Sequence, residues 1–220
     1  MYEQKREDMV NSLKKRGYLK NSKIIEAFQK VRREEFVPPR VKEDAYADRP
    51  LSIGNDQTIS APSMIAIMLE VLEAEKGQKI LEIGTGSGYN AALLAEIVGD
   101  EGRVYSLERL ESVAETGKKN LKKNGYKQVK VIVKDGTKGY EEESPWDRII
   151  ITACAPEVPK TLKKQLKVGG ILVGPVGEHY RSQTLLEMEK EGKEKIKTRK
   201  HGTCAFVPLI GEFGWNKSQT

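Results

Sequence analysis

The sequence has few of the residues that build disulfide-bonded or metal-bound proteins, with two cysteines and two histidines in 220 residues. A secreted disulfide scaffold of this size would carry more cysteines, so we expect a reducing, cytoplasmic environment. Cys154, Cys204 and the scattered histidines lack the spacing of a structural zinc site, so no metal is expected. No apolar run approaches the roughly 18 residues that span a membrane, and the charged start lacks a signal core. No membrane partner is therefore expected.

The charge of the chain is basic overall but mixed in sign. Lysine and arginine number 38 against 32 acidic residues, a formal charge of +6, which could suit RNA. Lysines are interleaved with glutamates in residues 187–195, however, which favours a solvated surface of mixed sign. We find neither a basic tract interleaved with aromatic residues nor an RNA-reading module, so no nucleic-acid partner is expected.

The first 60 residues predict a leader of helices and loops. Apolar residues recur at helical spacing until two prolines at 38–39 end the pattern. Residues 51–60 are mostly polar and contain a glycine, which predicts a loop or a short hairpin. A helix is expected next, with Ser60 near its cap and Pro62 in its first turn, continuing to Gly77.

Strand and helix patterns alternate in the middle of the chain. Strands are expected at residues 79–83, 103–107, 129–133, 146–152 and 171–173, and helices at 90–98, 111–124 and 159–166, the last stopped by glycines at 169–170. This alternation predicts a doubly wound parallel sheet of the α/β class. The strand at 146–152 contains three consecutive isoleucines, which indicates burial on both faces.

The pattern changes after Gly177, where strands follow one another without helices. Three such strands are expected at residues 184–188, 195–199 and 203–207, as antiparallel additions at the sheet edge. We therefore expect a single domain over residues 1–220. It divides into a leader at 1–60 that covers the site, a Rossmann-like core at 61–178, and antiparallel edge strands at 179–220.

A glycine-rich turn follows the first predicted strand of the core and opens a helix. Gly84, Gly86 and Gly88 allow the backbone to turn tightly and to approach a ligand closely. Glu82 stands just before the turn, where a carboxylate would repel a pyrophosphate but suits the cationic methionine moiety of S-adenosyl-L-methionine. The spacing G-x-G-x-G also departs from the dinucleotide fingerprint G-x-G-x-x-G. These features favour a methyltransferase cofactor over NAD.

Two further acids end the next two predicted strands. Glu108 lies 20 positions after Gly88, and a carboxylate there can accept both ribose hydroxyls. Asp135 ends the third strand, where it can bond the adenine amino group, and Gly136 lets the ring lie close. Singly, Glu108 could be an exposed strand-end acid and the Asp-Gly pair an ordinary turn. Three acids at successive strand ends are stronger evidence together.

Several segments of the chain together resemble one known family. They are residues 57–64 (Gln-Thr-Ile-Ser-Ala-Pro-Ser-Met), 80–89, 135–136, 151–156, 165–170, 175–177 and 206–209. In combination they are similar to the protein-L-isoaspartate O-methyltransferases over most of residues 50–210. The resemblance implies a class I methyltransferase that moves a methyl group from S-adenosyl-L-methionine to the free α-carboxylate of L-isoaspartyl residues. The expected partners are damaged proteins and peptides, whose repair this reaction initiates, and the expected product is S-adenosyl-L-homocysteine.

The resemblance also implies residue roles. Ser60 matches the active-site hydroxyl of the family and Thr58 lies beside it, although a simple helix cap is an alternative reading of Ser60. With Glu82 before the turn, the expected cofactor-binding residues are Ala61, Pro62, Ser63, Met64, Gly84, Gly86, Glu108, Asp135 and Gly136. Ser63 stands where the family usually has histidine, which puts any essential imidazole there in doubt.

The reaction that the resemblance implies suits a chain with few candidate bases. A carboxylate with a pKa of about 4 is already ionised at neutral pH. It needs no general base, and the only histidines are His179 and His201. We expect Ser60 to position the carboxylate rather than to act as a nucleophile. The segment at 205–209 could bind an extended peptide as an edge strand, or pack into the core.

Two other functions remain open from the sequence. One is a methyltransferase of the same fold that acts on RNA, which the positive charge would suit. The other is a non-catalytic nucleotide-sensing or scaffold protein, although a scaffold would not need Glu82, Glu108 and Asp135. We expect a monomer.

Overall fold

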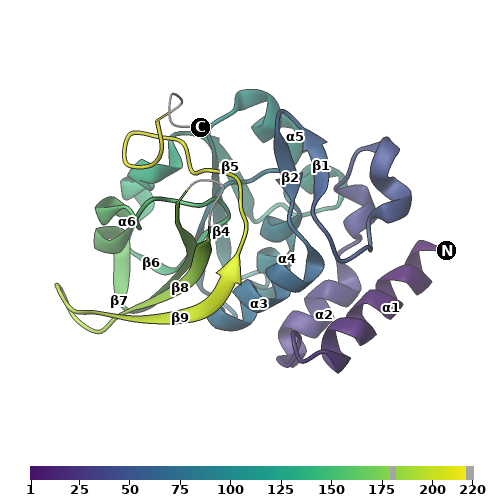
Figure 1. The fold of residues 1–220 in the computed structure, drawn as a ribbon, viewed down its shortest axis with the longest axis horizontal. Helices are drawn as coiled ribbons and strands as arrows, with labels where there is room; N and C mark the ends of the chain where they lie inside the picture. The colour runs from purple at the N-terminus through teal and green to yellow at the C-terminus, as the bar shows by residue number, and fades with distance from the viewer. Residues whose placement is uncertain (179–181, 217–220) are drawn as a thin grey trace.

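A seven-stranded sheet forms the centre of the molecule (Figure 1). The computed structural model describes residues 1–178 and 182–216. The strands are β3 (Lys79–Ile83), β4 (Arg103–Glu108), β5 (Val129–Val133), β6 (Trp146–Ile151), β7 (Leu166–Gly177), β8 (Gln183–Lys190) and β9 (Ile196–Cys204). Their order is β5-β4-β3-β6-β7-β8-β9; neighbours from β5 to β7 are parallel, and β8 and β9 are antiparallel. The predicted doubly wound, Rossmann-like sheet with antiparallel edge strands is confirmed.

Both faces of the sheet are covered, so successive residues of its central strands enter two different cores. The surrounding helices are α3 (Pro62–Leu72), α4 (Tyr89–Val98), α5 (Glu111–Lys123) and α6 (Lys160–Gln165). Ile150 of β6 packs in the core formed with α3 and α4, whereas Ile149 packs in the core formed with α6. Side chains alternate between the faces of a strand, so consecutive isoleucines are buried only where both faces are covered.

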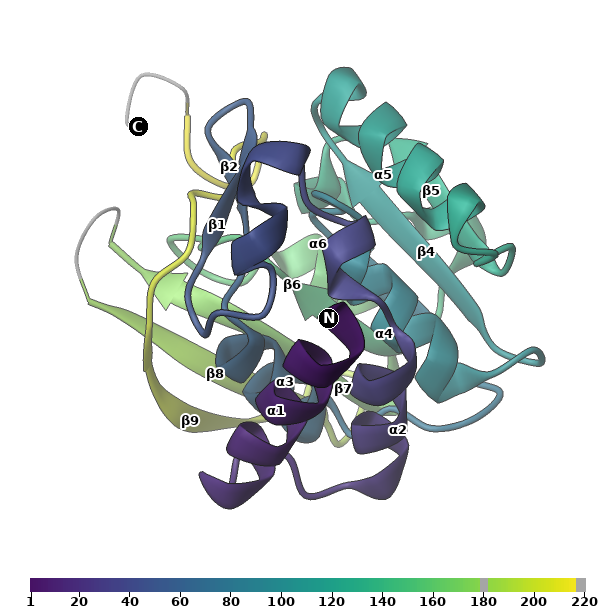
Figure 2. The same ribbon diagram turned by 90° about the vertical axis from the view of Figure 1, so that its right-hand side faces the viewer.

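The leader packs onto the first of these cores (Figure 2). Its elements are α1 (Tyr2–Lys15), α2 (Ser22–Lys30), the 3-10 turns η1 (Arg33–Glu35) and η2 (Pro39–Asp44), and a hairpin of β1 (Leu51–Gly54) and β2 (Gln57–Ile59). Leu13 and Phe28 of the leader are buried in the same core as Ile80 of β3. Phe28 meets the Tyr89 ring edge-on, with 6.5 Å between the ring centroids. The helices and the hairpin that the sequence predicts in this region are both present.

Helix α3 differs from its prediction at both ends. Its N-cap is Ala61, which has no capping side chain, so Ser60 is not the cap. The Asp48 carboxylate instead accepts the backbone N–H of Ser63 at 2.9 Å. The helix ends at Leu72 rather than at Gly77, because Glu73 adopts a left-handed conformation with φ of 50°. Ser60 directly precedes the N-cap and Pro62 is in the first turn, as predicted. The reading of Ser60 as the cap itself was wrong, because the capping group comes from a loop 15 residues upstream.

The last part of the sheet also differs from the prediction. The strands expected at 195–199 and 203–207 are one strand, β9, which continues to Cys204 and then leaves the sheet. A bulge between Thr184 and Leu186 in the pairing with β8 shifts the register. The sequence around this bulge therefore predicts a turn between two strands.

The glycine pair at 169–170 is likewise not a helix stop. Helix α6 ends at Gln165, and the glycines lie inside β7 at an irregular point of its pairing with β6.

No helix in residues 1–178 and 182–216 is long and apolar enough to cross a membrane. Over the same residues, no group of three or more histidine, cysteine or acidic side chains is arranged to hold a metal ion.

Candidate functional site

The glycine-rich turn lies at the carboxyl end of β3, between β6 and α5. Gly84 has a φ of +99°, and a Cβ built on it would lie 2.4 Å from Thr152 Oγ1. The Thr152 hydroxyl lies 3.0 and 2.9 Å from the carbonyl oxygens of Ile83 and Gly84 and shares its one proton between them. Only glycine tolerates both this backbone conformation and this proximity. The turn therefore holds a fixed path from β3 into α4.

Glu108 at the end of β4 faces this turn. Its Oε2 accepts the N–H of Gly86 at 3.2 Å, and its Oε1 accepts the N–H of Leu110 at 3.1 Å. Only 9% of the residue is exposed. The structure thus brings Glu108 and Gly86 together, as the positions of the two strand ends predict.

Glu82 lies beneath the turn and is fully buried. Its Oε1 accepts from Asn90 Nδ2 at 2.8 Å, and its Oε2 accepts from the Ser106 hydroxyl. Burial raises the pKa of Glu82 to about 7, while the hydrogen bonds from Ser106 and Asn90 oppose that rise. This carboxyl links β3 to α4 and β4. Direct contact between Glu82 and a ligand stays a prediction.

Asp135 is held by a C-terminal segment, residues 209–215, that the sequence analysis did not include in the site. Asp135 Oδ1 accepts from the N–H and the hydroxyl of Thr137 at 2.9 and 2.7 Å, and its Oδ2 accepts the N–H of Glu212 at 2.8 Å. A Cβ built on Gly211 would lie 2.1 Å from Asp135 Oδ1, so glycine is required for this close approach. The neighbouring Gly136 is buried. In the sequence, this contact is indicated only by Gly211 and Gly214, which lie beside two aromatic residues.

The same C-terminal segment also reaches the end of β6. The carbonyl of Cys154 accepts both the N–H of Leu209 at 2.7 Å and the indole N–H of Trp215 at 3.0 Å. The N–H of Cys154 donates to the Val207 carbonyl at 2.7 Å. The backbone of Phe206 is paired with the Gln183 side chain. Several backbone groups of the segment at 205–209 are therefore engaged within the chain, as the packing alternative predicts, and binding of a peptide along this segment stays a prediction.

The β1–β2 hairpin contacts the glycine turn through Ile53. Ile53 Cδ1 of β1 lies 3.6 Å from the position of a Cβ built on Gly86. On the partner strand Ile59 is buried, whereas Thr58 is exposed. Ser60 follows β2 directly, and its carbonyl accepts from Arg33 Nη2 at 2.8 Å. The hairpin thus lies against the turn. Thr58 is part of its second strand, and Ser60 is the next residue after that strand.

The remaining predicted cofactor contacts form the start of α3. Ala61 precedes the helix, and its carbonyl accepts the N–H of Ile65 at 3.1 Å. Pro62 is the first helical residue, followed by Ser63 and Met64, both half-buried.

His201 lies away from the glycine turn, in β9. His201 Nε2 is 2.6 Å from Glu187 Oε2 on the β8–β9 edge, and His179 lies outside the described residues.

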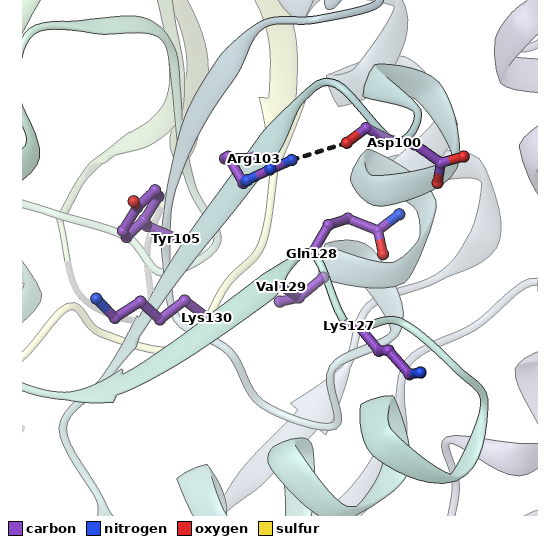
Figure 3. Close-up of a pocket in the computed structure, with 7 residues that line it drawn as sticks. All are labelled: Asp100, Arg103, Tyr105, Lys127, Gln128, Val129 and Lys130. Atoms are coloured by element: carbon purple, nitrogen blue, oxygen red, sulfur yellow. Dashed lines mark hydrogen bonds between the residues drawn. The ribbon is translucent and has the colours of Figure 1, made fainter.

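A cavity of about 580 Å³ lies at a different place, around the amino ends of β4 and β5 (Figure 3). It is lined by Asp100, Arg103, Tyr105, Lys127, Gln128, Val129 and Lys130. The guanidinium of Arg103 donates to the Asp100 carbonyl at 2.8 Å. None of the predicted site residues lines this cavity. It is at the opposite end of the strands from the glycine turn, so it is not the site described above.

The arrangement fits a nucleoside that carries a positive charge. Two carboxyl groups, of Glu82 and Glu108, lie below and beside the turn, and together they disfavour a pyrophosphate. Asp135 ends the next strand at the same edge of the sheet. Ligands of open α/β sheets bind at this carboxyl edge. Fold and site together define a class I, S-adenosylmethionine-dependent methyltransferase.

Comparison with known proteins gives the family. The chain belongs to the protein-L-isoaspartate(D-aspartate) O-methyltransferase family, whose model matches residues 4–214. It is 50% identical to a protein-L-isoaspartate O-methyltransferase of Methanopyrus kandleri over 100% of this chain and 97% of the relative. It is 53% identical to that of Staphylothermus marinus over 97% of both chains.

Two solved structures resemble it closely. One protein-L-isoaspartate O-methyltransferase has a TM-score of 0.86 and 33% identity, over 95% of this chain and 67% of the other. A Plasmodium falciparum protein of the same name, in complex with S-adenosyl-L-homocysteine, has a TM-score of 0.82 and 28% identity, over 92% of this chain and 97% of the other. The predicted family is thereby confirmed.

Proposed function

We propose that this chain transfers a methyl group from S-adenosyl-L-methionine to the α-carboxylate of L-isoaspartyl residues in damaged proteins and peptides, and so initiates their repair. The observation that carries the proposal is the position of the hairpin against the glycine turn, since the hairpin contains Thr58 and leads into Ser60. About half of the residues are identical to those of named family members, in alignments that cover nearly the whole chain. This identity supports the same substrate class.

The residues around the turn have distinct proposed roles toward the cofactor. Glu108 binds the ribose hydroxyls, and the Asp135-Gly136 pair binds the adenine. The backbone at Gly84 and Gly86 borders the cofactor, together with Ala61, Pro62, Ser63 and Met64. Glu82, whose pKa is about 7, favours the cationic part of the cofactor in its ionised form. When bound, S-adenosyl-L-methionine supplies an activated methyl group on a sulfonium, and the product is S-adenosyl-L-homocysteine.

The proposed roles of the hydroxyls follow from the chemistry of the acceptor. A substrate carboxylate with a pKa of about 4 is ionised at neutral pH, so no side chain has to remove a proton. The hydroxyls of Ser60 and Thr58 orient the carboxylate oxygen toward the methyl carbon. Alignment of this kind can supply a large part of the rate enhancement, provided that water is excluded.

The substrate class is tested by comparing three methyl acceptors in separate reactions. The enzyme is incubated with labelled S-adenosyl-L-methionine and an isoaspartyl peptide, its normal aspartyl twin, or tRNA. Base-labile label in the isoaspartyl peptide alone is expected, because its main chain runs through the side-chain carboxyl and leaves the α-carboxylate free. In the aspartyl twin the α-carboxyl of the same residue forms the peptide bond. Label in tRNA alone would make the enzyme an RNA methyltransferase, and no label in any acceptor would favour a scaffold.

The proposed partners are proteins and peptides, not nucleic acid, and the proposed form is a cytoplasmic monomer. Some lysines at the lysine-rich end of the sheet are engaged by groups of the chain itself, which supports this choice of partner. Lys195 pairs with Glu191 at 2.7 Å, and Lys190 donates to three backbone carbonyls. Cys154 and Cys204 are both unpaired thiols, in keeping with a reducing compartment.

A further inference from the structure

Two side chains of the leader hold opposite ends of the segment at 60–63. Arg33 Nη2 donates to the carbonyl of Ser60 at 2.8 Å. Asp48 Oδ1 accepts the N–H of Ser63 at 2.9 Å. This segment contains the proposed active-site hydroxyl at one end and proposed cofactor contacts at the other. The leader therefore sets where both parts of the site lie.

The side chain of Arg33 is fully buried, which is rare for arginine in proteins. Its Nε donates to the Ala45 carbonyl at 2.7 Å, and its guanidinium lies 4.9 Å from the centroid of the Tyr89 ring. Burial lowers the pKa of Arg33 to about 10, so the group remains charged at neutral pH. Both of these hydrogen bonds go to backbone carbonyls rather than to a carboxylate, although burial of a charge without an ionic partner is unfavourable. The contacts connect η1, the end of the hairpin, and the residue that begins α4.

Asp48 supplies the cap that α3 otherwise lacks. Its Oδ2 pairs with Arg16 Nη1 at 2.5 Å, which connects this capping group to the end of α1. Burial opposes ionisation of Asp48, but the bonds from Ser63 and Arg16 outweigh it and hold the pKa below its usual range. The negative charge of this carboxylate is also stabilised by the positive end of the helix dipole.

We infer that Arg33 and Asp48 are positioning residues for methyl transfer, each acting on one end of segment 60–63. Arg33 fixes the Ser60 backbone and hence the direction of its hydroxyl toward the substrate carboxylate. Asp48 fixes the first turn of α3, where Ser63 and Met64 border the cofactor. The inference rests on the proposed role of Ser60. It predicts different kinetic effects for the two residues.

The Arg33 end is tested with Arg33→Lys, which keeps the charge but cannot reach both carbonyls. We expect kcat to fall about 10- to 100-fold, since small displacements of a positioned group have effects of this size. The KM for S-adenosyl-L-methionine and the Kd of S-adenosyl-L-homocysteine should stay at their wild-type values. Arg32→Lys is the matched control, because Arg32 is the exposed neighbour and donates to Asn124 on the surface.

The Asp48 end is tested by the Kd of S-adenosyl-L-homocysteine. Asp48→Ala removes the cap and should raise this Kd about 2- to 30-fold, the range that corresponds to the loss of a capping group. Asp48→Asn keeps an acceptor for the Ser63 N–H and should restore most of the affinity. Asp44→Ala is the control, because Asp44 is an exposed acid that pairs with the equally exposed Arg49. An equal loss of affinity in Asp48→Asn and Asp48→Ala would overturn the capping role.

A double-mutant cycle separates positioning from general stability. If Arg33 acts through the Ser60 hydroxyl, Arg33→Lys should have little further effect on kcat once Ser60 is alanine. Effects of the two changes that multiply would overturn the role of Arg33 and leave that of Ser60 intact. A wild-type kcat in Ser60→Ala alone would instead refute the proposed role of Ser60, and with it this inference. Binding of S-adenosyl-L-homocysteine by each variant shows that the site is still folded.

Discussion

Glu82 is a fully buried acid whose ionisation depends on its surroundings more than on its own chemistry. Burial raises its pKa from 4.5 to about 7, although Ser106 and Asn90 both donate to it. The folded chain therefore binds this proton more tightly than the unfolded chain does. The stability that the group contributes is complete below pH 4.5 and is lost as the pH rises through about 7.

Glu82→Gln should consequently reduce the decline in stability between pH 4.5 and 7. One pKa unit corresponds to about 1.4 kcal/mol, so the change from 4.5 to about 7 is worth about 3 kcal/mol across that range. The free energy of unfolding of both proteins would be measured from pH 4.5 to 8 by denaturant titration. Glu101→Gln, at an exposed acid, is the control and should leave the wild-type slope. An unchanged slope in Glu82→Gln would contradict the raised pKa.

Ser60 does not cap α3, so the alternative reading as a simple helix cap no longer accounts for its hydroxyl. Ser60→Ala is expected to lower kcat about 10-fold or more, because the substrate carboxylate loses a positioning hydrogen bond. The Kd of S-adenosyl-L-homocysteine should be unchanged. Ser112→Ala, on the exposed face of α5, serves as the control. Methyl transfer at the wild-type rate in Ser60→Ala would end the proposed role.

At the scale of elements, the C-terminal segment at 209–215 acts as a connection between two strand ends. It bonds Asp135 after β5 through the Glu212 N–H and bonds Cys154 after β6 through Trp215. Lys138 adds an ion pair to Glu212 at 2.5 Å. The position of the proposed adenine-binding acid is therefore fixed by a part of the chain 77 residues away.

Gly211→Ala tests this connection. Its Cβ would lie 2.1 Å from Asp135 Oδ1, so either Asp135 or the segment must move. Overpacking typically costs about 1–3 kcal/mol, and we expect the Kd of S-adenosyl-L-homocysteine to rise about 10-fold by calorimetric titration. Gly192→Ala is the matched control, because its Cβ would lie 3.7 Å from Lys195 Cβ, an ordinary contact. Equal affinity in both variants would show that Asp135 does not bind the adenine.

At the scale of the whole molecule, the parts that the sequence predicts are those encoded locally. β3 and β5 have the predicted bounds, because each is an apolar run ended by charge or glycine. Glu108 meets Gly86 because parallel strands place their carboxyl ends at one edge.

The parts that the sequence did not predict depend on distant contacts. Arg33 reaches Ser60 across 27 residues, and Glu212 reaches Asp135 across 77. The β8–β9 bulge is also a property of the pair, since neither strand shows it alone. Local patterns carry no information about such pairings.

The leader and the sheet share one core, which predicts how the molecule unfolds. Leu13 and Phe28 are buried with Ile80 and Val104 of the sheet. Calorimetric unfolding should therefore be a single transition in which the calorimetric and van't Hoff enthalpies agree, as for one cooperative domain. Phe28→Ala should destabilise the whole transition by about 3–5 kcal/mol without splitting it, because the cavity opens in a core that both parts share. Two resolved transitions, with only the first moved by Phe28→Ala, would show instead that the leader is a separate folding unit.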